Sequence, residues 1–81
     1  MYDFKIEAAD KPALYRDLNA ALEALVAGEP DGIANMANAA ALIWERLPDL
    51  NWAGFYRNVG GELVLGPFQG RPACIRIPFG Q

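Results

Sequence analysis

Cys74 is the residue of this sequence that is best suited to covalent chemistry, and it is the only cysteine among the 81 residues. It lies in the stretch ACIRI close to Arg71 and Arg76, and nearby cations favour the nucleophilic thiolate form. If ACIRI is a strand, the side chains of Cys74 and Arg76 leave the same face. A redox cycle normally needs a second thiol to resolve a sulfenic acid, so Cys74 is either one part of a redox site or a small hydrophobe on a strand.

Trp52 and Tyr56 form the second candidate site, because their spacing in NWAGFYRN places both rings on one face of a strand. Gly54 lies between them, which predicts a recess flanked by two aromatic faces. Such faces suit a methyl-sulfur group or a cation. The alternative is that both rings are core residues, while Ala53 and Phe55 face the other side of the strand.

The composition argues against several other kinds of chemistry. The chain has no histidine, which removes the commonest general base and a usual zinc ligand, and we expect no metal site. Its formal charge of −3, with scattered Lys and Arg residues, argues against nucleic acid as a partner. No apolar run reaches the ~18–20 residues of a membrane span, so we expect no membrane partner. One unpaired cysteine fits the reducing cytoplasm.

Two helices followed by three strands must position these side chains. Leucines recur at helical spacing early in the chain, and Gly28 stands where that helix should end. Asp31 is expected to cap a second helix, which Pro48 terminates. The hydrophobic period then changes from about 3.6 to 2, with a glycine-containing turn at 59–61. The predicted helices are 10–28 and 31–47, the predicted strands are 51–58, 62–68 and 73–77, and 2–7 is a short strand or an ordered arm.

This architecture is α+β, with two helices packed on one face of an antiparallel meander. The first strand carries large apolar side chains on both faces, and nothing else in the sequence would cover the second face. The third strand also ends without a partner, which leaves an edge open to pairing. We therefore expect the chain to self-associate or to pair with a complementary fragment.

Three stretches resemble the free methionine-(R)-sulfoxide reductases, a family of small GAF-domain enzymes. They are NWAGFY, then LVLGPFQGRPACIRIPFG, and before both of them GEPDGIANMANAAALIW. The resemblance implies a GAF-like fold, in which helices cover one face of an antiparallel sheet and a ligand pocket lies on the other. Residues 1–81 would then be the N-terminal portion of a single GAF domain, truncated after the third strand of the meander.

The same resemblance implies a function. Enzymes of this family reduce the R-sulfoxide of free methionine by cysteine thiol/disulfide chemistry, with thioredoxin as the external reductant and no bound cofactor, and a homodimer is expected. Trp52 and Tyr56 match the aromatic residues of the family's substrate pocket, and Cys74 matches the first of three cysteines, which has the resolving role. The other two cysteines, and the acidic residues that hold the substrate amine, would lie beyond Gln81, so the chain alone is expected to be inactive. The alternatives are a GAF module that binds or senses a small molecule without turnover, and an inert fragment.

Overall fold

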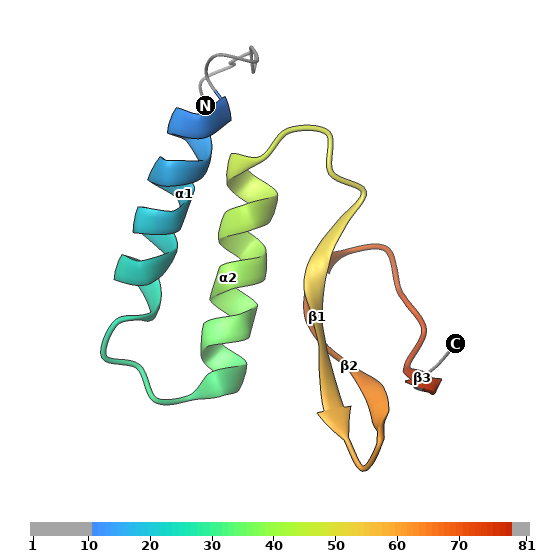
Figure 1. The fold of residues 1–81 in the computed structure, drawn as a ribbon. Helices are drawn as coiled ribbons and strands as arrows, with labels where there is room; N and C mark the ends of the chain where they lie inside the picture. Colours follow the sequence, from blue (N-terminus) through green and yellow to red (C-terminus); the bar gives the residue numbers. More distant parts are fainter. Residues whose placement is uncertain (1–10, 79–81) are drawn as a thin grey trace.

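Two helices precede a three-stranded antiparallel sheet in the computed structural model, which describes residues 11–78 (Figure 1). The strand order in the sheet is β1-β2-β3, so each strand pairs with its neighbour in sequence, as a meander does. This confirms the expected fold class. The elements are α1 Lys11–Val26, α2 Gly32–Arg46, β1 Trp52–Val59, β2 Glu62–Gly70 and β3 Arg76–Pro78.

The helices begin and end close to the predicted residues. Gly28 follows α1 with a φ of 78°, a left-handed conformation that suits the end of a helix. The carboxylate of Asp31 accepts hydrogen bonds from the backbone N–H groups of Ile33 and Ala34, at 3.0 and 3.3 Å, and thereby caps α2 as predicted. The predicted segment 2–7, and the start of the first predicted helix at Asp10, lie outside the described residues.

Helix α2 lies between α1 and the sheet (Figure 1). It packs on β1 and β2, whereas α1 packs on α2 and, within residues 11–78, contacts no strand. The buried apolar side chains come from all three layers and are small or medium in size: Leu18, Ala40 and Ala53. No large side chain in the described part of the chain is fully buried, so the core is thin for a globular domain. None of the described helices is long and apolar enough to cross a membrane.

The pairing of β1 with β2 contains one irregularity. Gly54 pairs with Phe68 and Tyr56 pairs with Leu65, so β2 advances one residue further than β1 over this interval. The extra residue falls at 66–67, where Pro67 has no N–H group to donate to the ladder, and a bulge accommodates such a residue. At the other end of the hairpin, the predicted turn is confirmed by two successive glycines with positive φ.

Strand β3 begins at Arg76, so the prediction that it starts at Ala73 was wrong. Val64 of β2 pairs with Arg76, the first residue of β3. Immediately before β3, the Ile75 carbonyl still accepts a hydrogen bond from the Leu65 N–H group at 2.8 Å. Further back, the Cys74 carbonyl accepts its hydrogen bond from a side chain, the Tyr56 hydroxyl, rather than from β2. The β2–β3 pairing thus stops next to the bulge in β2, and residues 73–75 precede strand β3.

Packing around Gly54 joins the two long strands. A Cβ atom at this position would lie 2.8 Å from the Phe68 Cα atom and 2.8 Å from the Trp52 Cη2 atom, and it would also collide with Phe68 Cβ. Only a residue without a side chain lets the Trp52 ring and the facing strand approach this closely.

We expect Asp31→Ala to lower the free energy of unfolding by about 1 kcal/mol, because two N–H groups at the start of α2 lose their acceptor. Urea denaturation followed by far-ultraviolet circular dichroism measures the change. Asp17→Ala is the matched control, since it removes an exposed carboxylate from the interior of α1. Equal destabilisation by the two substitutions would contradict the capping role.

We expect Gly54→Ala to destabilise the fold by about 1–3 kcal/mol, because the added methyl group overlaps Phe68 and Trp52. Tryptophan fluorescence during urea denaturation measures both the stability and the environment of the ring. Gly32→Ala is the control, since no atom lies within 4 Å of its Cβ position and the residue starts a helix. A Gly54→Ala protein as stable as the Gly32→Ala protein would show that this close approach is not needed.

Candidate functional site

Trp52, Tyr56 and Phe68 form a stack of three rings, which we call the aromatic cluster. The Trp52 and Tyr56 ring centroids are 6.0 Å apart with an interplanar angle of 28°, and those of Trp52 and Phe68 are 5.6 Å apart at 18°. All three side chains are half-buried. The stack confirms that Trp52 and Tyr56 lie together on one face of β1.

Phe68 was not recognised as a neighbour of this pair from the sequence. It pairs with Gly54 across the β1–β2 ladder, so the absence of a side chain at Gly54 brings its ring against Trp52. The signal that could have found it is the hairpin register. Counting back from the 59–61 turn is not enough, however, because the bulge at 66–67 shifts the register by one residue.

The recess predicted over Gly54 is not present in this structure. Trp52 Cη2 and Phe68 fill the space where a side chain at Gly54 would stand. Glycine therefore serves close packing of the two rings rather than an open gap between Trp52 and Tyr56. A ligand at this face would contact the outer surfaces of the stack.

The Tyr56 hydroxyl connects the aromatic cluster to the segment that carries Cys74. It donates a hydrogen bond to the Cys74 carbonyl oxygen, with an O–O distance of 2.8 Å, across a sequence separation of 18 residues. The Cys74 side chain is exposed and unpaired, so the interpretation of a hydrophobe packed on a strand does not hold. The structure therefore brings the backbone of the predicted redox residue against one of the two predicted binding residues.

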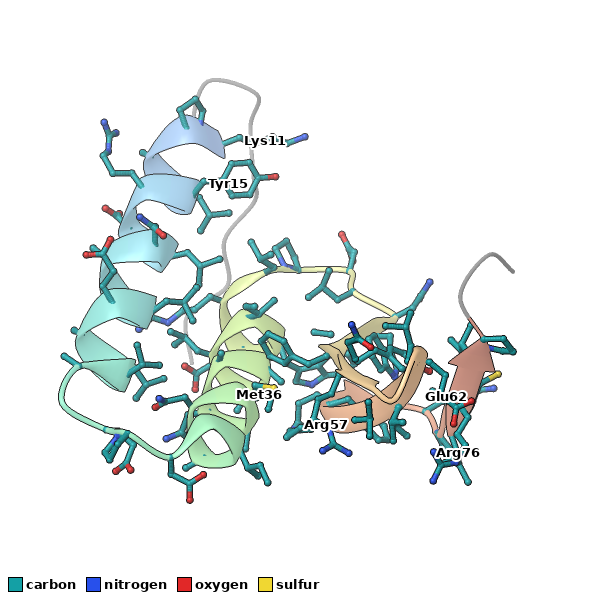
Figure 2. The ribbon with its side chains drawn as sticks, turned by 60° about the horizontal axis from the view of Figure 1, so that its bottom comes forward. Lys11, Tyr15, Met36, Arg57, Glu62 and Arg76 are labelled. Carbon is teal, nitrogen blue, oxygen red and sulfur yellow. The ribbon has the colours of Figure 1, made fainter. Side chains whose placement is uncertain are left out.

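Arg76 does not take the position beside the thiol that the sequence suggested. Its guanidinium Nη1 lies 2.9 Å from the Glu62 Oε1 atom, and the two side chains meet at the edge of the sheet (Figure 2). No hydrogen bond joins Arg76 to Cys74 within the described residues. Because Cys74 precedes β3, the two residues do not alternate along one strand, and the expectation of a shared face was wrong. The ion pair is largely exposed, and such pairs contribute little to stability.

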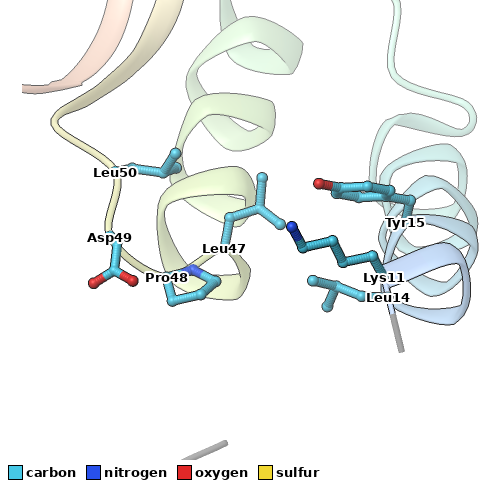
Figure 3. Close-up of a pocket in the computed structure, with 7 residues that line it drawn as sticks. All are labelled: Lys11, Leu14, Tyr15, Leu47, Pro48, Asp49 and Leu50. Atoms are coloured by element: carbon cyan, nitrogen blue, oxygen red, sulfur yellow. The ribbon is translucent and has the colours of Figure 1, made fainter. Parts of the chain in front are cut away.

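A pocket of about 330 Å³ lies at the opposite end of α2 from the Asp31 cap, between the start of α1 and the loop that leads to β1 (Figure 3). Its lining combines apolar side chains with an ammonium group, a phenol and a carboxylate, and it includes none of the predicted site residues. Within residues 11–78, no three His, Cys, Asp or Glu side chains gather as metal ligands would. The residues that line the pocket are Lys11, Leu14, Tyr15, Leu47, Pro48, Asp49 and Leu50.

Comparisons with known proteins agree with this geometry. The chain is 54% identical over 72 residues to the free methionine-R-sulfoxide reductase of Escherichia coli, which covers 89% of this chain and 44% of that protein. The structure of this chain superposes with a TM-score of 0.81 on the free methionine-R-sulfoxide reductase of Neisseria meningitidis in complex with its substrate. The two sequences are 47% identical, and the match covers 100% of this chain and 49% of the other. A solved GAF domain gives a TM-score of 0.79 at 34% identity, covering 99% of this chain and 54% of that one.

No protein-family model matches the chain. The chain spans about half the length of the curated relatives that it matches. High identity over nearly all of its own length, together with the same arrangement of helices and strands, leads to one conclusion. This chain belongs to the free methionine-R-sulfoxide reductase family and carries about half of that family's GAF fold.

Proposed function

We propose that this chain supplies the aromatic wall of the substrate site and one redox cysteine to a free methionine-(R)-sulfoxide reductase. The observation that carries the proposal is the hydrogen bond from Tyr56 to the Cys74 carbonyl, because it holds a thiol-bearing segment against stacked rings. Outer ring surfaces of Trp52 and Tyr56 suit the methyl-sulfur end of the substrate. A reactive sulfur beside such a surface is the minimum that sulfoxide reduction requires.

As the family resemblance implies, we assign Cys74 the resolving role rather than the attacking one. A thiolate attacks the sulfoxide sulfur, the sulfoxide oxygen passes to the enzyme, and methionine leaves as the thioether while the thiol becomes a sulfenic acid. A second thiol then displaces water from the sulfenic acid and forms a disulfide, which the thioredoxin dithiol reduces. We assign this second step to Cys74, and the attacking cysteine to the part of the fold that this chain does not cover. No bound cofactor is part of this scheme, and reduction by thioredoxin agrees with a cytoplasmic location.

The chain by itself lacks the means to complete this cycle. It holds one thiol, so the two-electron oxidation cannot end in an intramolecular disulfide. Its core is also thin, since no large side chain of residues 11–78 is fully buried and Ile75 is 69% exposed. We therefore propose that it functions with a complementary half of the fold or as a homodimer.

The activity test compares the chain alone with the chain mixed with the part of the Escherichia coli reductase that it does not match. We expect no thioredoxin-dependent formation of methionine from free methionine-(R)-sulfoxide by the chain alone, and measurable turnover by the mixture. Cys74→Ser should abolish most of the thioredoxin-coupled turnover in the mixture while leaving stoichiometric release of the first methionine. Sustained turnover by residues 1–81 alone would overturn the proposal.

The association test follows from the exposed apolar surface. We expect sedimentation velocity to show dimers or larger species of the chain alone, and a defined one-to-one complex when the complementary half is added, because burial of apolar surface drives both. Ile75→Ser and Val59→Ser remove exposed apolar side chains, 69% and 44% accessible, and should weaken the association. A chain that stays monomeric and does not bind the complementary half would contradict this part of the proposal.

A second candidate function is binding without turnover. The likeness to a solved GAF domain supports it. Calorimetric binding of free methionine-(R)-sulfoxide by the reconstituted pair, without release of methionine in the presence of reduced thioredoxin, would favour this candidate. Neither binding nor turnover would leave the chain as an inert fragment.

A further inference from the structure

The indole N–H group of Trp52 has no hydrogen-bond partner. The Nε1 atom is buried, and no acceptor lies within reach of it in the part of the chain that the structure describes. Trp52 Nε1 is the one buried side-chain nitrogen or oxygen of residues 11–78 in this condition. Buried donors are almost always satisfied in folded proteins, because an unmet donor loses the hydrogen bond that it makes to water in the unfolded chain. Since the proposed function places Trp52 against the ligand, an acceptor on the ligand would satisfy this donor.

The position of the ring defines where that acceptor must lie. The six-membered end of the indole lies over Gly54, where Cη2 occupies the space of the missing side chain. The five-membered end lies against Gly70, whose Cβ position would be 3.0 Å from Trp52 Cδ1, the atom bonded to Nε1. The N–H group is thus at the Gly70 end of the cluster, where the chain leaves β2 for the segment that carries Cys74.

The aromatic cluster offers two hydrogen-bonding groups, and one of them is already engaged. The Tyr56 hydroxyl donates to the Cys74 carbonyl, whereas Phe68 has no polar atom. The Trp52 N–H group is therefore the one donor of the cluster without a partner within residues 11–78, and indole nitrogen donates but does not accept. Because Nε1 is buried, an acceptor can reach it only from the Gly70 end of the cluster.

We infer that Trp52 donates a hydrogen bond from Nε1 to the oxygen of the bound sulfoxide, and that this contact distinguishes the oxidised from the reduced ligand. The inference rests on the proposed function, because it concerns the ligand of that same site. A sulfoxide oxygen is a strong acceptor, whereas the thioether sulfur of methionine is a weak one. A site built to hydrogen-bond an oxygen rejects the analogue that lacks it, since the donor is then left unpaired.

This contact also has a consequence for product release. Once the oxygen has left the substrate, methionine holds only ring-to-sulfur contacts at this end of the site, and the indole N–H is again without an acceptor. Trp52 thereby becomes a specificity-determining residue that favours binding of the sulfoxide and departure of the thioether.

The indole proton itself reports the contact. The test protein is the Trp44→Phe variant labelled with ¹⁵N, in which Trp52 gives the only indole signal, and the probe is dimethyl sulfoxide, a small molecule that carries the sulfoxide group alone. Trp44 is 40% exposed in α2, so its replacement leaves the aromatic cluster intact. We expect a saturable downfield shift of the Trp52 indole proton with dimethyl sulfoxide and none with dimethyl sulfide.

The matched control is the Trp52→Phe variant, in which the exposed Trp44 gives the only indole signal. That signal should move only slightly and in proportion to the concentration of dimethyl sulfoxide. Equal behaviour of the two indoles, a fixed Trp52 signal, or an equal shift with the sulfide would each overturn the inference. Methionine formation by the reconstituted pair is assayed separately, so turnover with a fixed Trp52 signal would reject this contact while the proposed function stands.

Discussion

The close approach of the Trp52 ring to Gly54 is the constraint on which the rest of this structure depends. Because Gly54 has no side chain, the end of the indole ring occupies that space, and the ring stacks with both Tyr56 and Phe68. That stack sets the position of the Tyr56 hydroxyl, and the hydroxyl in turn holds the Cys74 carbonyl at 2.8 Å. A packing contact within one hairpin therefore fixes the position of the aromatic cluster relative to the backbone at Cys74.

The second feature of the molecule is how little of its apolar surface is covered. Helix α2 packs on β1 and β2. Even so, no large side chain of the described residues is fully buried, and Ile75 and Trp44 remain exposed. A chain of this length buries roughly 60–65% of its unfolded surface even in a complete domain, so a half-length member of a GAF family has little stability to spare.

In the proposed function, the redox chemistry is divided between this chain and the part of the fold that it does not cover, and the division follows from electron counting. Reduction of the sulfoxide removes two electrons from the enzyme's thiols, and a chain with a single thiol cannot give them up by forming an internal disulfide. Cys74 is exposed and lies on a segment held by one side-chain hydrogen bond, rather than in a strand. Such a segment can present its sulfur to a second cysteine more readily than a strand position can, which agrees with a resolving role.

The sequence by itself determined the order and type of the elements, because those depend on local signals. Leucine spacing, the Asp31 cap and the glycine turn at 59–61 act over a few residues, and the family resemblance was readable in contiguous motifs. What only the tertiary structure decided is where Cys74, Phe68 and Arg76 lie. The bulge at Pro67 shifts the β1–β2 register. The Tyr56 hydroxyl donates a hydrogen bond to the Cys74 carbonyl, and Arg76 forms an ion pair with Glu62. Each of these features involves residues that are distant in sequence, and no local pattern determines which residues pair.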